Sequence, residues 1–208
     1  MTVAEIDPHD PAAFAELARR DPRVAAALAR HGVPAPRRRP ADLRTLARII
    51  VGQQVSARAA ATIWGRLEAA AGGAVTAQTI LGLGDEAMRR AGLSRQKRRY
   101  LRALAEAVAA GRLDPGALGD LPDEEVIAAL TALPGFGVWS AQMYLIFALA
   151  RPDVWPAADL GVRSGLQLIL GLAARPQLHE ADALAGPFRP LRSALALLAW
   201  HVLHNEPA

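Results

Sequence analysis

The sequence predicts an all-α fold, and three observations lead to that prediction. Apolar residues recur at the three- and four-residue spacing of helices in almost every segment of the 208 residues. Alanine, leucine, arginine and glutamate dominate, and β-branched runs are short. Aromatic residues make up 5% of the chain, while 52% of it is hydrophobic, which argues against disorder over most of its length.

Each predicted helix lies between residues that start or stop helices. Ser56 and Ser94 are placed as N-caps, and Gly32, Gly72 and Gly111 as stops. The predicted helices cover residues 11–32 (one or two short helices), 42–54, 56–72, 76–82, 85–91, 94–111, 123–133, 138–150, 159–170 and 190–204. The proline-rich segment 33–40 is a connector, because proline does not fit a helix interior.

Composition excludes several classes of chemistry. The chain has no cysteine, which rules out disulfides, iron–sulfur clusters, thiolate zinc sites and cysteine nucleophiles, and fits a reducing compartment. We find neither a signal-peptide pattern in the first thirty residues nor an apolar run of the roughly 18–20 residues that a membrane span needs. A cytoplasmic protein is expected. The formal charge of +4 permits an anionic partner such as nucleic acid.

The segment "LPGFGVWSAQ" at 133–142 interrupts helical sequence with Gly135 and Gly137. A glycine lets the backbone adopt positive φ and removes the Cβ that would keep a ligand away. Two glycines just before a helix let several free amides point outward at its positive end, which suits a phosphate. The alternative is an ordinary turn between two helices.

Asp159 stands at the predicted start of a helix, 20 residues after Trp139 and behind a loop that contains Pro156. An N-cap is one interpretation of this carboxylate, since aspartate is a preferred cap. The hairpin and the segment "GQQVS" at 52–56, where two glutamines end a helix between apolar runs, favour a second interpretation as a functional group.

The chain resembles the helix-hairpin-helix (HhH-GPD) DNA glycosylase superfamily, and within it the 3-methyladenine DNA glycosylase II (AlkA-like) branch. The resemblance extends from about residue 41 to residue 204. Four segments in matching order carry it: "GQQVS" at 52–56, "GLSRQK" at 92–97, "LPGFGVWSA" at 133–141 and "RPDVWPAADLG" at 151–161.

The resemblance implies roles for individual residues. Asp159 would be the catalytic carboxylate. The wall of the base pocket would be formed by Trp139, Met143, Leu160 and Leu191. DNA would be contacted by Gln53, Gln54, Val55, Ser56, Gly135, Gly137 and Ser140, with Val55 as the wedge that replaces a flipped base. A structural sodium or potassium ion, which catalysis would not require, would be held by the main-chain carbonyls of Thr131, Leu133 and Phe136.

The implied reaction is removal of alkylated purines, such as 3-methyladenine and 7-methylguanine, from duplex DNA by base flipping and cleavage of the N-glycosidic bond. An alkylated purine leaves with positive charge, so one carboxylate that stabilises the sugar cation or activates a water suffices. Relatives that also cut the strand form a Schiff base through a lysine where this chain has Trp139. Because the only lysine is Lys97, in another predicted helix, no lyase activity is expected.

Some residues depart from the family pattern. Ala158 replaces an aspartate, Ser140 replaces a threonine, and Met143 and Leu191 stand at aromatic positions, which leaves the substrate range open. The alternatives are a glycosylase of the same superfamily for another base, such as hypoxanthine, and a non-catalytic DNA-binding module. A helical protein unrelated to nucleic acid would require all four segments to be coincidental.

Weaker signals have simpler explanations. The basic run 95–102 is either a stripe that faces DNA or a solvated helix face, and Arg37 to Arg39 either steer DNA or solubilise a connector. His201 and His204 are three residues apart on a predicted helix, but no third ligand stands near them in the sequence, so a metal pair is not favoured.

The expected organisation has two helical lobes with a DNA-binding cleft between them. Residues 41–150 form the lobe that carries the hairpin. The second lobe is built from residues 1–40 and from residues 151–208, which contain the aspartate loop. A monomer that acts on damaged double-stranded DNA, and is associated with the nucleoid when bound, is expected.

Overall fold

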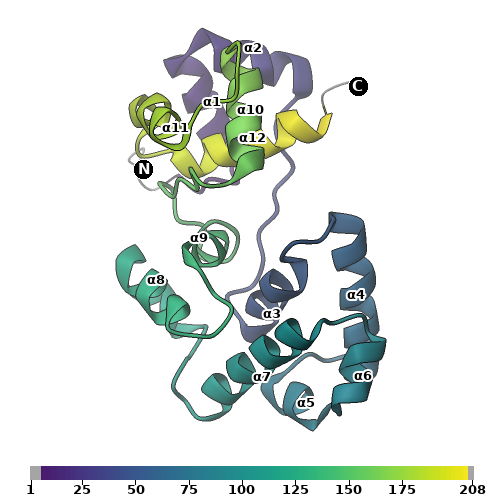
Figure 1. The fold of residues 1–208 in the computed structure, drawn as a ribbon. Coiled ribbons are helices and arrows are strands. Elements are labelled where there is room, and N and C mark those ends of the chain that lie inside the picture. Colours follow the sequence, from purple (N-terminus) through teal and green to yellow (C-terminus); the bar gives the residue numbers. More distant parts are fainter. Residues whose placement is uncertain (1–5, 206–208) are drawn as a thin grey trace. The chain divides into compact units, whose positions relative to one another are not determined.

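The computed structural model describes residues 6–205, and no strand occurs in that range. The all-α prediction is confirmed. The helices, labelled in Figure 1, are α1 (Pro11–Arg20), α2 (Pro22–His31), α3 (Leu43–Gly52), α4 (Ala57–Ala70), α5 (Ala77–Gly82), α6 (Asp85–Arg90), α7 (Arg95–Ala109), α8 (Asp123–Thr131), α9 (Val138–Phe147), α10 (Leu160–Leu170), α11 (Leu178–Ala185) and α12 (Arg192–Asn205). Two short 3₁₀ turns, Ala117–Asp120 and Gly186–Phe188, complete the helical segments.

Helix starts follow the predicted caps. The Ser56 hydroxyl accepts a hydrogen bond from the Ala59 amide, and the Ser94 hydroxyl accepts one from the Lys97 amide, both at 3.2 Å. Both caps are confirmed. The segment 11–32 is two helices, because Asp21 caps α2 directly after α1 ends.

Several helices end two or three residues earlier than predicted, and two of them, α3 and α9, do so shortly before a non-glycine residue with positive φ. Helix α3 stops at Gly52, since Gln53 takes an extended conformation and Gln54 a left-handed one with φ of +54°. Helix α9 stops at Phe147, and Ala150 is left-handed with φ of +52°. Neither of these residues is glycine, so the sequence carries no local signal for either reversal.

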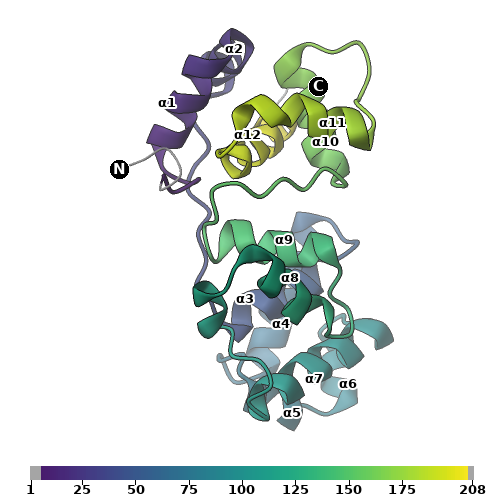
Figure 2. The same cartoon turned by 90° about the vertical axis from the view of Figure 1, so that its left-hand side faces the viewer.

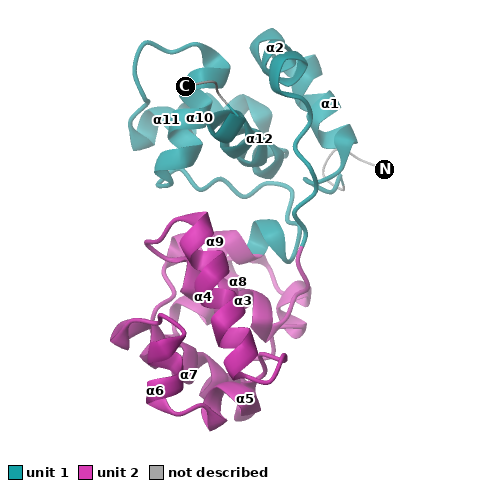
Figure 3. Ribbon diagram, turned by 90° about the vertical axis from the view of Figure 1, so that its right-hand side faces the viewer, with its two compact units in different colours: residues 1–38, 145–208 teal, residues 39–144 magenta. Residues whose placement is uncertain are grey.

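The chain forms two compact units, which Figure 3 colours separately. One unit contains residues 39–144, and the other contains residues 1–38 together with 145–208. The division expected from the sequence placed the breaks at 40 and 150. Helix α9 contains the second boundary. None of the described helices is long and apolar enough to cross a membrane.

The unit of residues 39–144 is built around α7. Its inner face packs against α3 and α5, and α6 also contacts it, as Figure 2 shows. Leu101 and Leu104 of α7 are completely buried, as are Leu46 and Ile50 of α3. Buried side chains of α3 and α7 therefore form the core of this unit.

The other unit is built around a close crossing of α10 and α12, on which α1 and α2 also pack. Gly165 makes this crossing possible, because a Cβ added there would lie 2.0 Å from the carbonyl oxygen of Ala199. Leu166 of α10 and Leu195 and Leu198 of α12 are completely buried in the same core.

Candidate functional site

Position 135 is glycine for a reason that the protein's own structure supplies, whereas position 137 is not. Gly135 has φ of +93°, and a Cβ added there would lie 2.3 Å from the ring of Tyr100. Gly137 has no positive φ and is exposed, and a Cβ added there would meet no atom within 4 Å. Backbone conformation and the Tyr100 ring therefore account for Gly135. At Gly137 the space that a Cβ would fill is open.

Backbone amides in the hairpin and at the start of α9 have no acceptor within the described residues. Among the described residues, the amides of Gly135, Gly137 and Val138 donate no hydrogen bond, and the first bond of the helix runs from the Ala141 amide to the Gly137 carbonyl at 3.1 Å. Residues 132–142 carry no charged side chain. An anion here would therefore be held by amides and by the positive end of the helix dipole.

Gln53 connects the end of α3 to this hairpin. Its side-chain Nε2 donates to the carbonyl oxygen of Gly135 at 2.8 Å and to the hydroxyl of Ser140 at 3.2 Å. Ser140 is 3% exposed. These side chains, for which the resemblance implies DNA contact, hold each other and the hairpin in place.

The residues after Gln53 face solvent. Gln54 is exposed in its left-handed conformation, and the Val55 side chain is 37% exposed. Ser56 uses its hydroxyl to cap α4. A strained backbone conformation at an exposed polar residue beside an exposed valine is typical of functional loops.

Lys97, the single lysine, supports the same loop. Its ammonium group donates a hydrogen bond to the carbonyl oxygen of Val51 at 2.8 Å, near the end of α3. Burial lowers the pKa of Lys97. This anchoring contact was not predicted, although Lys97 lies in "GLSRQK" at 92–97, one of the four segments that carry the resemblance.

In the other unit, Asp159 caps α10. Its Oδ1 accepts a hydrogen bond from the Val162 amide at 2.9 Å and a second one from the indole Nε1 of Trp200 at 3.1 Å. The side chain is half-buried. The N-cap interpretation is thus confirmed, and it is compatible with a chemical role because a cap also fixes the carboxylate in space.

The loop before Asp159 is fastened to the start of α12. Asp153 forms a two-point ion pair with Arg192, with Nε–Oδ1 and Nη2–Oδ2 distances of 2.7 and 2.9 Å. The Val154 amide donates to the Ser193 hydroxyl at 2.8 Å. These anchoring residues were not predicted, although they lie in "RPD" at 151–153 and "RS" at 192–193.

The four predicted pocket residues differ in exposure. Trp139 and Leu160 are 37% and 57% exposed, so both offer surface to a ligand. Met143 is 6% exposed and Leu191 is completely buried. Trp139 and Met143 belong to the unit of residues 39–144, and the two leucines belong to the other unit.

The predicted cation ligands lie between the last residue of α8 and the start of α9. The carbonyl oxygen of Leu133 accepts a hydrogen bond from the Phe136 amide at 3.2 Å, and those of Thr131 and Phe136 accept none from the described residues. Carbonyl oxygens without hydrogen-bond donors are suitable ligands for a monovalent cation, so the donor set fits the expected ion.

The basic run on α7 is partly occupied by intramolecular contacts. Arg98 pairs with Asp85 at 2.9 Å, and Arg102 donates to the Leu83 carbonyl at 2.9 Å. Arg95 and Arg99 are exposed. Three of the five basic residues in the run, Arg98, Arg102 and Lys97, therefore make contacts within the fold, which leaves the solvated-face interpretation for the other two.

The remaining weak signals also have structural partners. Arg38 pairs with Asp7 at 2.8 Å. His201 lies 2.8 Å from the His31 carbonyl, and His204 lies 2.5 Å from the Trp200 carbonyl. No group of three metal-ligand side chains occurs within residues 6–205, and both histidines contact backbone carbonyls.

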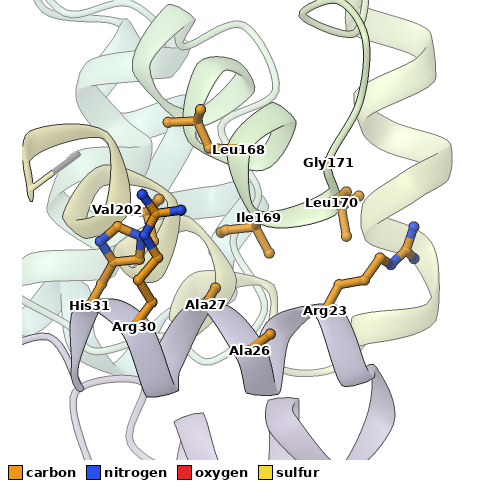
Figure 4. Close-up of a pocket in the computed structure, with 10 residues that line it drawn as sticks. All are labelled: Arg23, Ala26, Ala27, Arg30, His31, Leu168, Ile169, Leu170, Gly171 and Val202. Atoms are coloured by element: carbon orange, nitrogen blue, oxygen red, sulfur yellow. The ribbon is translucent and has the colours of Figure 1, made fainter. Parts of the chain in front are cut away.

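A cavity of about 270 Å³ opens between α2, the end of α10 and α12 (Figure 4). Figure 4 shows an apolar floor with cationic side chains at its edges. Its lining residues are Arg23, Ala26, Ala27, Arg30, His31, Leu168, Ile169, Leu170, Gly171 and Val202. None of the residues predicted for the reaction lines it.

Comparison with known proteins points to one family. The family model described as "HhH-GPD superfamily base excision DNA repair protein" matches residues 47–190. DNA-3-methyladenine glycosylase 1 of Schizosaccharomyces pombe is 33% identical over 74% of this chain and 69% of its own length. The protein of Mycobacterium tuberculosis named "Probable bifunctional transcriptional activator/DNA repair enzyme AlkA" is 30% identical over 94% of this chain but only 40% of its own length.

Solved structures give the same result. The 3-methyladenine DNA glycosylase of S. pombe in complex with abasic DNA superposes with a TM-score of 0.84 at 30% identity, covering 91% of this chain and 95% of that one. The DNA-3-methyladenine glycosidase of Bacillus halodurans superposes with a TM-score of 0.79, also at 30% identity, covering 96% and 92%.

Proposed function

This chain belongs to the HhH-GPD superfamily of base excision DNA repair proteins, and we propose that it is a monofunctional DNA glycosylase that excises alkylated purines from duplex DNA. The observation that carries the proposal is Asp159, a carboxylate held by two N–H donors at the start of α10. The relatives named as 3-methyladenine glycosylases support the substrate class.

The proposed chemistry needs one carboxylate. A purine alkylated at N3 or N7 carries positive charge and leaves readily, so the developing charge lies on the sugar. An ionised Asp159 would stabilise that cation or direct a water to it. Trp139, with 37% of its surface exposed, would stack on the cationic base.

The proposed DNA contacts come from the unit of residues 39–144. The amides of Gly135, Gly137 and Val138, which donate no hydrogen bond within the described residues, would bind a backbone phosphate, and this contact would position the enzyme without reading sequence. The exposed Val55, next to Gln54, would fill the gap that the flipped base leaves. Gln53 and Ser140 would act indirectly, by holding the hairpin.

Strand cleavage is not part of the proposal. A Schiff base requires a lysine amine, and position 139 is tryptophan. The single lysine, Lys97, donates to the Val51 carbonyl near the end of α3. We further propose a structural sodium or potassium ion at the carbonyls of Thr131, Leu133 and Phe136, a monomeric state, and a location in the cytoplasm with the DNA.

The test is release of free bases from methylated duplex DNA. Wild type should release methylpurines, and Asp159→Asn should still bind DNA but lose release by at least a hundredfold. Nicks should appear only after alkali treatment. Asp182→Asn, an exposed carboxylate on α11, is the matched control and should behave as wild type.

Other results would change the assignment. Release of hypoxanthine without methylpurines would indicate a glycosylase of the same superfamily for deaminated bases. Salt-sensitive DNA binding with no release from any damaged duplex would indicate a non-catalytic binding module. Nicking without alkali would contradict the monofunctional mechanism.

A further inference from the structure

The indole of Trp200 contacts the Asp159 carboxylate directly. Its Nε1 lies 3.1 Å from Oδ1 of the carboxylate. Gly161 makes room for this contact, because a Cβ added there would lie 3.1 Å from Asp159 Oδ1 and 3.2 Å from Trp200 Cδ1. Gly161 is helical, without positive φ, so backbone conformation does not explain its presence.

The orientation of the indole is set by an aromatic stack. The Phe147 ring lies 5.7 Å from the Trp200 ring at an interplanar angle of 26°, and the His9 ring lies 6.0 Å from Phe147. His9 is 4% exposed, and its Nε2 lies 3.0 Å from the Ile146 carbonyl. The ring behind Trp200 is thus itself held in place.

The two helices that carry these groups are held close together. Gly165 of α10 packs directly on the backbone of Ala199, the residue before Trp200. The distance between Asp159 and Trp200 is therefore determined by a close-packed helix crossing within one unit rather than by flexible side chains.

We propose that Trp200 is a positioning residue for the Asp159 carboxylate, acting through its indole N–H. Two donors, the Val162 amide and the indole, bind the same oxygen, Oδ1. Together they fix the plane of the carboxylate and thus the direction of Oδ2. A carboxylate held in one orientation needs no rearrangement as the sugar cation forms. This inference rests on the proposed glycosylase activity.

The experiment removes the N–H but keeps the ring. Position 200 is replaced by benzothienylalanine, in which sulfur takes the place of the indole N–H, by site-specific incorporation. The matched control is the same replacement at Trp64, whose buried indole nitrogen has no hydrogen-bond partner among the described residues. Gly161→Ala, which inserts a Cβ between the two groups, is the second variant.

The readouts separate chemistry from folding. We expect the single-turnover rate of methylpurine release to fall about 10- to 100-fold for both changes, as loss of a hydrogen bond to a charged group implies. Affinity for a duplex with a tetrahydrofuran abasic analogue should stay within twofold of wild type, as should the rate of the control at position 64. Trp200→Phe should reproduce the loss of rate.

An unchanged release rate for both the benzothienyl variant and Gly161→Ala would overturn the proposal. Losses of rate that are matched by equal losses of DNA affinity and of melting temperature would also overturn it, since they indicate a purely structural tryptophan. If wild type releases no base, the proposed function fails, and this inference fails with it. If wild type releases base, Asp159→Asn does not, and both test variants keep the wild-type rate, then the proposed function stands and only the role of Trp200 is contradicted.

Discussion

The ring of Tyr100 on α7 packs against the backbone of Gly135 in the hairpin, where an added Cβ would lie 2.3 Å from the ring. The tyrosine ring occupies the space under the turn, and φ of +93° at Gly135 carries the chain over it. The Tyr100 side chain of α7 therefore supports the backbone of the candidate phosphate site at Gly135.

Gly135→Ala should destabilise the protein by about 2–4 kcal/mol, because a clash with a packed ring adds to the cost of a left-handed conformation. Urea unfolding followed by circular dichroism measures this change. Adding Tyr100→Ala should recover the part of the loss that is due to the clash. A loss below about 0.5 kcal/mol for the single variant would contradict the packing described above.

Gly137→Ala should leave stability nearly unchanged, since its Cβ would meet no protein atom. If DNA binds against this part of the backbone, the affinity of the Gly137→Ala variant for duplex DNA should nevertheless fall about tenfold. The added methyl group would occupy space that the DNA backbone needs. Fluorescence anisotropy at fixed salt measures this affinity. Gly65→Ala, in the exposed middle of α4, is the control and should raise stability slightly without changing DNA affinity.

Gln53→Ala should lower stability by about 1–2 kcal/mol, since it removes hydrogen bonds to the Gly135 carbonyl and the buried Ser140 hydroxyl. DNA affinity should fall as well, because the hairpin amides lose their support. Gln78→Ala on the exposed face of α5 is the matched control and should stay within about 0.5 kcal/mol of wild type. Equal effects of the two variants would contradict a role of Gln53 in holding the hairpin.

Tyr144→Phe should show a pH-dependent effect on stability. Burial raises the pKa of Tyr144 above its ordinary value of 10.0, and the hydroxyl donates to the Pro115 carbonyl at 2.8 Å. The folded state then holds this proton more tightly than the unfolded state. The stabilisation is complete below pH 10 and is lost as the pH rises toward the folded-state pKa.

At pH 8 the Tyr144→Phe variant should therefore be less stable than wild type by about 1 kcal/mol, the contribution of one hydrogen bond. By pH 11 the difference should shrink by about 1.4 kcal/mol and disappear or reverse. Urea midpoints at both pH values measure it. Phe14→Leu is the control, because Phe14 is buried and does not titrate. Its stability should differ from that of wild type by the same amount at both pH values.

Local features of this protein were predictable from the sequence. Ser56 and Ser94 cap helices as predicted, and Asp159 caps α10 while it stands where the family motif places its carboxylate. Caps, stops and helical periodicity depend on residues within one or two turns of each other, so their signals lie close together in the chain. Each of the four ordered motifs is likewise a short continuous segment, so the family could be identified from the sequence.

The contacts that organise the candidate site were decided by tertiary structure. Gln53 reaches Gly135 across 82 positions, and Trp200 reaches Asp159 across 41. No local pattern specifies which side chain a donor meets after helices pack, because that depends on how closely two helix surfaces approach. The sequence by itself therefore determined the helices and the family and made Asp159 the candidate carboxylate, while packing alone decided what holds Asp159 and why position 135 is glycine.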